Sequence, residues 1–493
     1  MASKRGTSTS AFGVSKREGH DASDFYSRLT LPDLSDRDQV NTNDAIESSV
    51  CFTGSSIEMH QLADDSVALV VTSPPYFVGK EYELAVTGED EGTRSVPTSY
   101  LDYLELLRDV FAECVRVLEP GGRIAVNVAN LGRKPYRSLS ADVIRILQDD
   151  LGLLLRGEVI WAKSKASSGS CAWGSFAKAT NPVLRDNTER VIIASKGRFS
   201  RARTSGQRKS AGIPHASTLT NDEFIDVTRD IWEIDAESAT RVGHPAPFPV
   251  DLPRRLIDLY TFVGDTVVDP FAGSGSTLVA AVRTGRIGVG YDLDHAYVEL
   301  ATARLADETA RTERIQSAMV TDDQTGLTDH ERRDLFYEKA LEEGKKISDI
   351  AERVLGELGF KIESRKPSVR GIGLDYDFIV SSTDGEQVWY IDIAGSFTSA
   401  KSGLERSEGV WRVLGRLSAL RSIEPDARVI VLTPNLPRKT SPSAKALRAV
   451  GPTELFDAVE LFDPAGQTRL GAYASGESDT PIVGFWDSAD LAE

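Results

Sequence analysis

The chain has 493 residues, of which 40% are hydrophobic and 27% charged. This composition is that of a soluble globular protein, and the length exceeds what one core normally organises, so two or more domains are expected. The formal net charge is −17. No apolar stretch reaches the roughly 18 residues of a membrane span, and three widely spaced cysteines predict a reducing compartment without disulfides. We therefore expect a cytoplasmic protein with no membrane partner and no bound metal.

Residues 1–42 are predicted to be a flexible N-terminal arm. The segment is rich in Ser, Lys and Asp and has no continuous apolar run. It therefore resembles neither a signal peptide nor a transit peptide.

Residues 43–310 alternate strand-like apolar runs with helical patterns, which predicts βαβ units around a parallel sheet. In chain order, the expected strands are 66–71, 123–127, 155–161, 190–195, 266–268 and 288–291, and the expected helices are 100–118, 252–260, 276–284 and 295–307.

A diproline loop, Ser73-Pro74-Pro75-Tyr76, follows the apolar run 67–71. Adjacent prolines fix φ and remove two donors, so the loop should be rigid, with carbonyls free to accept hydrogen bonds. Loops at the carboxyl ends of strands in open α/β sheets bind ligands. A hydroxyl before the prolines and an aromatic ring after them suit a flat molecule with an amino group, such as a nucleobase.

A second loop, from Asp269 to Ser276, carries Gly273 and Gly275 in a predicted strand-to-helix turn. Such a turn lets backbone N–H groups approach a ligand, although it can also serve helix packing alone. Asp292 ends the next apolar run, where an acid accepts hydrogen bonds from ribose hydroxyls. Because Asp269 would repel a pyrophosphate but suits a cationic ammonium, the loop favours S-adenosyl-L-methionine over a dinucleotide.

Residues 165–215 are less periodic and are predicted to be a target-recognition region. Between 196 and 209 the chain has no acidic residue and six basic ones, Lys196, Arg198, Arg201, Arg203, Arg208 and Lys209. Such a segment either follows a phosphate backbone and binds DNA or is simply a solvated surface run.

With these motifs in this order, the chain resembles the permuted (β-class) DNA amino-methyltransferases of the N4-cytosine/N6-adenine type. In that class the catalytic motif precedes the cofactor motif. The segments 79–82, 118–122, 172–176 and 244–249 add to the resemblance. It implies an α/β fold with a Rossmann-like S-adenosylmethionine-dependent methyltransferase domain, extending over 43–310.

The resemblance also implies roles for single residues. Phe271, Gly273 and Gly275 would line the cofactor site, with Asp269 near the methionine amino group and Asp292 on the ribose.

At the catalytic loop, Ser73 and the Pro74 carbonyl would accept the two N–H bonds of an exocyclic amine on a base flipped out of duplex DNA. Tyr76 would stack on that base, and the methyl group would transfer directly. Serine at position 73, where many relatives carry aspartate, favours the N4 atom of cytosine, with N6 of adenine as the alternative.

After a linker at 311–328, residues 329–493 are predicted to form a smaller α/β domain resembling the restriction endonucleases. Its expected strands are 374–380, 387–393 and 428–432. Asp375, Asp377 and Asp392 match the acids of that fold, but Ala394 stands where its lysine belongs. We expect a degenerate nuclease that serves DNA binding or assembly. An active endonuclease fused to its protecting methylase is the alternative.

The predicted function is that of a site-specific DNA methyltransferase of restriction–modification or phage defence. Methylation of RNA or of a protein amide shares the diproline loop, and a DNA-binding assembly factor with a relic loop is a third hypothesis. The predicted partner is double-stranded DNA with one flipped base. A homodimer and a separate cognate restriction endonuclease stay open.

Overall fold

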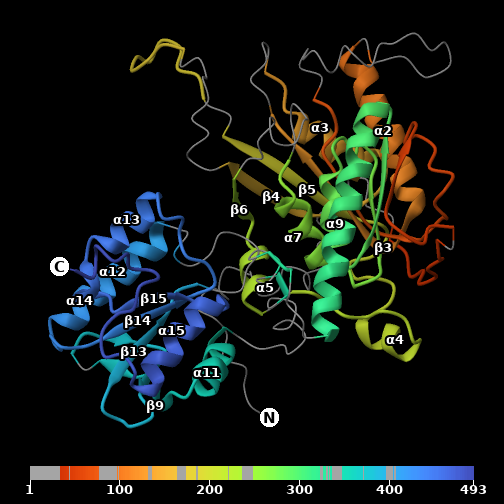
Figure 1. Cartoon of the computed structure of the whole chain (residues 1–493). Helices are drawn as coiled ribbons and strands as arrows, with labels where there is room; N and C mark the ends of the chain where they lie inside the picture. Colours follow the sequence, from red (N-terminus) through yellow and green to blue (C-terminus); the bar gives the residue numbers. More distant parts are fainter. Residues whose placement is uncertain are drawn as a thin grey trace, which may run out of the picture.

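The computed structural model of the chain forms two α/β units (Figure 1). It describes residues 34–43, 45–76, 97, 99–130, 136–163, 174–184, 187–219, 221–235, 248–321, 326–328, 331, 334–335, 347–369, 371–395, 404 and 407–492.

The N-terminal unit is built on an eight-stranded sheet with the order β1-β8-β7-β2-β3-β5-β4-β6. The strands are β1 (Val50–Thr53), β2 (Val67–Thr72), β3 (Leu118–Val128), β4 (Leu154–Lys163), β5 (Thr188–Ser195), β6 (Ile231–Ile234), β7 (Thr266–Asp269) and β8 (Ile287–Asp292). The six predicted strands are confirmed, whereas the edge strands β1 and β6 were not predicted. The sheet is mixed rather than parallel, because β5 runs antiparallel to its neighbours β3 and β4.

Helices cover both faces of this sheet. They are α2 (Tyr100–Val117), α3 (Leu139–Arg145) with the π-helical turn Ile146–Asp150, α4 (Ser205–Ser210), α5 (Asn221–Val227), α7 (Asp251–Tyr260), α8 (Ser276–Arg283) and α9 (His295–Thr321). The predicted helices are confirmed, and α9 extends well beyond its expected end.

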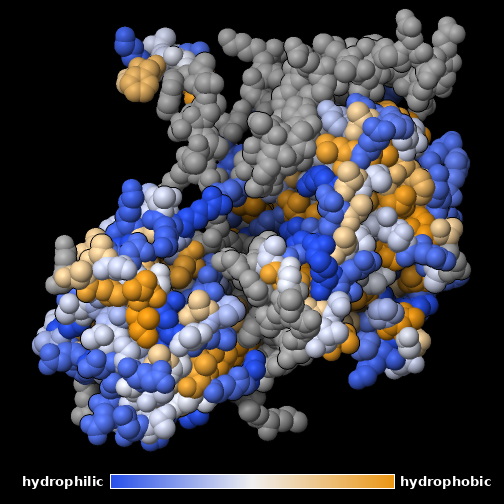
Figure 2. Space-filling model, viewed as in Figure 1, coloured by the Kyte–Doolittle hydropathy of each residue, from blue (hydrophilic) through white to orange (hydrophobic). Residues whose placement is uncertain are grey.

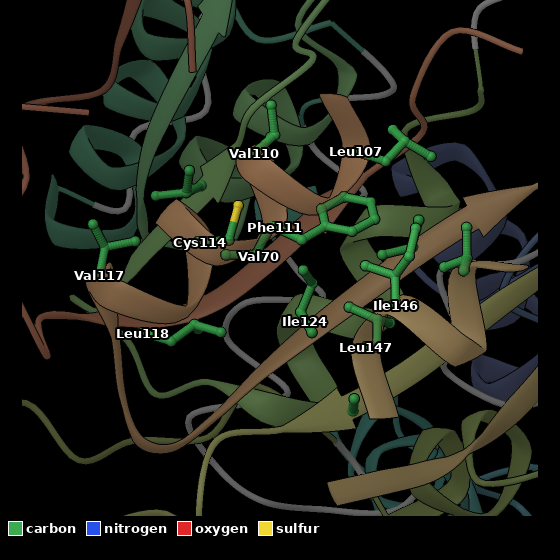
Figure 3. Packing of buried hydrophobic residues seen from close by; sticks show 14 of the residues in the cluster. Val70, Leu107, Val110, Phe111, Cys114, Val117, Leu118, Ile124, Ile146 and Leu147 are labelled. Carbon is green, nitrogen blue, oxygen red and sulfur yellow. The ribbon is translucent and has the colours of Figure 1, made fainter. Parts of the chain in front are cut away.

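Helix α2 shows why the layers form. It begins at a capping box in which Ser99 and Asp102 satisfy each other's backbone N–H groups. Its apolar residues recur every three or four positions, so they line one face, and Leu107 and Phe111 on that face have no exposed surface. They pack with Val70 of β2, as Figure 3 shows.

The opposite face of the sheet is covered by α7 and α8. Leu69 of β2 and Val267 of β7 pack there against Leu256 and Ala280. Since successive residues of a strand point to opposite faces, β2 is buried on both sides. Strands buried in this way hold the loops at their ends in fixed positions.

The two cysteines of the described chain are packing residues. Cys51 and Cys114 are buried and form no disulfide. Burial raises the pKa of Cys51 to about 12, so its thiol stays protonated.

The described part of the predicted N-terminal arm is held on the sheet unit rather than free. Arg37 pairs with Asp65 at 2.5 Å, and the backbone N–H of Ser35 donates to the carbonyl of Gly197. Residues 1–33 lie outside the described chain.

The carboxy-terminal unit contains a five-stranded sheet with the order β15-β14-β13-β12-β9. Its strands are β9 (Lys361–Arg365), β12 (Phe378–Ser381), β13 (Val388–Ile393), β14 (Val429–Thr433) and β15 (Asp457–Glu460), with a separate ribbon of β10 (Ser368–Val369) and β11 (Leu374–Asp375). Its helices are α11 (Ile347–Glu357), α12 (Ser407–Arg421), α13 (Pro442–Arg448), α14 (Gly451–Glu454) and α15 (Pro464–Ser475). Antiparallel pairing of β9, β12 and β13 gives way to parallel pairing of β13, β14 and β15.

One predicted strand of this unit, 374–380, is wrong. The chain leaves the β10–β11 ribbon after Asp375 and joins the main sheet only at Phe378. The backbone changes partner between two successive residues. The Tyr376 N–H donates to the Pro367 carbonyl, whereas the Asp377 N–H donates to the carbonyl of Ile391 in β13.

On the face drawn in Figure 2, hydrophilic residues cover much of both units, with apolar residues among them. Within the described residues, no helix combines the length and apolar character that crossing a membrane requires.

Candidate active site

The diproline loop (Ser73–Tyr76) and the loop from Asp269 to Ser276, which we call the glycine loop, lie together at the carboxyl ends of neighbouring strands of the large sheet. Strands β2 and β7 pair in parallel through Leu69–Val267 and Val70–Val268, so both loops leave their strands on the same side. The hydroxyl of Thr72 donates to Oδ1 of Asp269 over 2.7 Å. This contact joins the diproline loop to the glycine loop, although the two residues are 197 positions apart in sequence.

Asp269 ties three elements together. Its side chain has no exposed surface, and it also accepts hydrogen bonds from Thr277 Oγ1 of α8 at 2.6 Å and from the Phe271 N–H at 3.1 Å. Burial raises its pKa to about 6. The prediction that Asp269 lies near a methionine ammonium stays a prediction. These contacts indicate that the carboxylate fixes the loop from beneath.

The glycine loop needs its glycines. Gly273 and Gly275 have φ values of 48° and 77°, which side chains rarely tolerate. A Cβ added to Gly275 would lie 2.9 Å from the Cβ of Ala301. Because Gly275 caps α8, the N-terminus of that helix opens toward this loop.

Asp292, at the end of β8, holds the same loop from the next strand. Its carboxylate accepts from the Gly273 N–H at 2.8 Å and from the Asp294 N–H at 3.0 Å. The residue is half-buried, and burial raises its pKa. Both carboxylate oxygens therefore help to fix the backbone of the glycine turn and of the segment after β8.

A polar cluster supports the diproline loop. Ser73 Oγ lies 2.9 Å from the hydroxyl of Tyr76, which donates to Glu189 Oε2 over 3.0 Å. Asn127 donates to the same oxygen over 2.5 Å, and Lys163 pairs with Oε1 of Glu189 at 2.5 Å. Burial, together with the nearby Glu189 carboxylate, raises the pKa of Tyr76 well above its usual range, so its phenol stays protonated.

Strand direction explains how these groups meet. Asn127 is near the end of β3 and Lys163 at the end of β4. Glu189 is near the start of β5, which runs the opposite way, so its start lies at the edge where β3 and β4 end. Glu189 and Asn127 are 7% and 1% exposed.

Sequence reasoning missed these supporting residues, although signals were present. Asn127 interrupts the apolar run 124–128, and Glu189 lies two residues before the run 191–194. A polar residue inside or next to a buried strand requires a polar partner. Here that partner is the diproline loop.

Half of the predicted DNA-binding basic residues face inward, so the expectation of a free cationic segment is wrong for them. Lys196 pairs with Asp65 at 2.7 Å. Arg201 and Arg208 are both largely buried and pair with Asp265 at 3.1 and 2.7 Å. Their acidic partners are distant in sequence, which a local charge count does not detect.

The other three stay candidates for DNA contact. Lys209 is exposed on α4, and Arg203 is half-exposed just before it. Arg198 donates to the carbonyl of Arg37 at 2.8 Å. Of the segments that supported the resemblance, 79–82, 172–173 and 244–247 lie outside the described residues.

In the carboxy-terminal unit, the predicted acids do not form one open cluster. Asp392 pairs with Arg416 of α12 at 3.1 Å, and burial raises its pKa to about 6. Asp377 accepts from the Ile393 N–H at 2.7 Å, while Asp375 is exposed on the ribbon. Among the residues with described positions, no three His, Cys, Asp or Glu side chains are placed to hold a metal ion.

The family comparison concerns the N-terminal unit. Residues 67–303 match the family model described as DNA methylase (N6_N4_Mtase). The type II methyltransferase M.MthZI of Methanothermobacter thermautotrophicus is 28% identical over 288 residues, covering 54% of this chain and 79% of that protein. M.MjaI of Methanocaldococcus jannaschii is 29% identical over 269 residues, covering 49% and 86%.

Solved structures are similar to about half of the chain. The protein TTHA0409 of Thermus thermophilus is 30% identical, with a TM-score of 0.40, covering 53% of this chain and 95% of that one. Its complex with S-adenosyl-L-methionine is 29% identical, with a TM-score of 0.39, covering 53% and 96%.

Titration of Asp269 should make the N-terminal unit less stable as the pH rises. The pKa of Asp269 in the folded protein is about 6, above the ordinary value of 3.8. The protonated side chain therefore stabilises the fold fully below about pH 4, and this contribution is lost as the pH rises through about 6. Asp269→Asn removes this titration. It should flatten the decline by on the order of 2–3 kcal/mol between about pH 4 and pH 7.

Urea unfolding across that pH range, followed by hydrogen exchange of β2 and β7 amides, measures the effect. Asp150→Asn, at an exposed position, is the matched control and should keep the wild-type slope. If the free energy of unfolding of Asp269→Asn falls with pH as steeply as that of the wild type, Asp269 is not the group responsible for the decline.

Proposed function

We propose that the chain, whose residues 67–303 match the family model of the N6/N4 DNA methylases, methylates the N4 atom of cytosine in duplex DNA. The methyl donor is S-adenosyl-L-methionine, and the domain is of the permuted class over 43–310. The single observation that carries the proposal is the hydrogen bond between Thr72 and Asp269. It holds the base-binding loop and the donor-binding loop at one edge.

The glycine loop fits the methyl donor. The first turn of α8, which Gly275 caps, offers backbone N–H groups. Ser276 Oγ, at the start of α8, is buried and has no hydrogen-bond partner among the described residues. Asp292, at the end of β8, is half-buried, and Phe271 of the glycine loop is half-exposed; we assign the ribose to the first and the lining of the donor site to the second.

When bound, S-adenosylmethionine supplies an electrophilic methyl group on a sulfonium. The chain must then present a nucleophile, and the exocyclic amine of a base is a poor one because its lone pair is delocalised into the ring. Ser73 Oγ and the Pro74 carbonyl accept its two N–H bonds, which draws the nitrogen toward tetrahedral geometry and frees the lone pair. Catalysis thus arises from positioning and from complementing developing charge.

The base itself must leave the duplex, because its amine is otherwise paired and shielded. Tyr76 offers a ring for stacking while its hydroxyl is held by Glu189. Ser73 favours cytosine N4 as the acceptor, and adenine N6 is the alternative product. Since the similar proteins from archaea are named type II methyltransferases, we place the chain in a restriction–modification system.

We propose that the carboxy-terminal unit is a degenerate, restriction-endonuclease-like domain that binds DNA or supports assembly. Two features support this role over cleavage. Arg416 occupies the carboxylate of Asp392, and Ala394 stands where the nuclease lysine is expected. A magnesium site would need that carboxylate for itself.

Ser73→Ala should abolish methyl transfer while leaving donor binding intact. Removing the hydroxyl deprives the amine of an acceptor, which we expect to lower kcat by roughly a hundredfold or more. Transfer of a labelled methyl group to duplex DNA measures this loss, and calorimetry measures donor binding.

The control Ser317→Ala, at an exposed site on α9, should match the wild type. Mass spectrometry of digested nucleosides should find N4-methylcytosine. Detection of N6-methyladenine would show that adenine is the target base. Absence of any methylated base would contradict the proposed function.

The carboxy-terminal unit should not cut DNA. Unmethylated plasmid incubated with the full chain and magnesium is expected to stay intact, as it should with Asp392→Ala. Specific cleavage by the wild type that Asp392→Ala eliminates would instead establish a fused endonuclease.

A further inference from the structure

A chain of hydrogen bonds runs from β5 to the catalytic loop. Glu189 Oε2 is 3.0 Å from the Tyr76 hydroxyl, which is 2.9 Å from Ser73 Oγ. The ion pair with Lys163 at 2.5 Å holds the other oxygen of Glu189 and leaves Oε2 turned toward the tyrosine.

The chemistry of these groups fixes the direction of every bond. A carboxylate only accepts, so the Tyr76 hydroxyl must donate its hydrogen to Glu189. The tyrosine oxygen can then only accept along the 2.9 Å contact, and the hydrogen there comes from Ser73. Asn127 Nδ2 is a donor too, 2.5 Å from Glu189 and 3.3 Å from the Tyr76 oxygen, which agrees with this direction.

The direction of these hydrogen bonds matters at Ser73 because a serine hydroxyl can donate as well as accept. If it donated to the target amine, it would occupy the lone pair that must attack the methyl group. With its hydrogen held by Tyr76, the half-exposed Ser73 Oγ keeps a lone pair for the amine, while Asn127 Nδ2 lies 3.4 Å from the same oxygen. An aspartate in this position would need no such arrangement, since it is an acceptor by nature.

We propose that Glu189 is a positioning residue that, through Tyr76, makes the Ser73 hydroxyl an obligate acceptor for the target amine. This inference rests on the proposed function and adds residues outside the diproline loop to its machinery. Glu189 touches no reacting atom in this scheme. Because it orients the acceptor of the target amine, replacing Glu189 should slow methyl transfer rather than weaken the binding of the donor or of DNA.

Glu189→Gln tests the direction of the chain, because the amide can turn its NH2 group toward the tyrosine oxygen. Tyr76 would then donate to Ser73, whose hydrogen would be released toward the amine. We expect kcat to fall roughly ten- to a hundredfold, as for the loss of one oriented hydrogen bond in a transition state. KM for the donor and for DNA should change less than about threefold, because ground-state contacts persist.

Tyr76→Phe removes the link without changing the ring and should lower kcat by a similar factor. In the double variant the losses should not multiply, since both changes break one chain. Glu158→Gln, an identical change at an exposed position of β4, is the matched control and should keep wild-type kcat.

Thermal melting and donor binding, measured on each full-length variant, exclude loss of folding as the cause. A wild-type kcat in Tyr76→Phe would overturn the inference even if Glu189→Gln failed to fold. Multiplying losses in the double variant would overturn it as well. Absence of methyl transfer by the wild type would instead overturn the proposed function.

Discussion

The hydrogen bond from Thr72 to Asp269 is the constraint on which the rest of the N-terminal unit depends. A carboxylate without exposed surface is costly unless donors surround it, and here donors from β2, from α8 and from the glycine loop converge on it. Two loops far apart in sequence are thereby fixed relative to each other before any ligand arrives. Such preorganisation is what a reaction that works by positioning requires.

The antiparallel strand β5 supplies the second constraint. A parallel strand would carry Glu189 to the opposite edge of the sheet. Because β5 is reversed, its start lies beside the ends of β3 and β4, and Glu189 reaches Tyr76 and Asn127 there. The scaffold therefore contributes a buried polar layer beneath the diproline loop, in which Ser73 is half-exposed and Pro74 is buried.

Local signals in the sequence were enough to predict the strands that end at Ser73 and at the glycine loop. The prolines, the glycines and Asp292 each dictate backbone geometry or acceptor chemistry within a few residues. Contacts between distant segments were not predictable in this way. The inward pairing of Arg201 and Arg208 with Asp265 depends on where β7 begins, and the position of Glu189 depends on the direction of β5.

In the carboxy-terminal unit, the run 374–380 has strand composition throughout, yet its backbone divides between two sheets because tertiary packing decides its partners.

The most direct measurement is a crystal structure of the full chain with an unreactive analogue of S-adenosylmethionine and duplex DNA containing its site. We predict one extruded base whose amine lies about 3 Å from Ser73 Oγ, in line with the position of the donor methyl group. A donor bound away from the loop after β7, or a target amine out of reach of Ser73, would contradict the proposed mechanism.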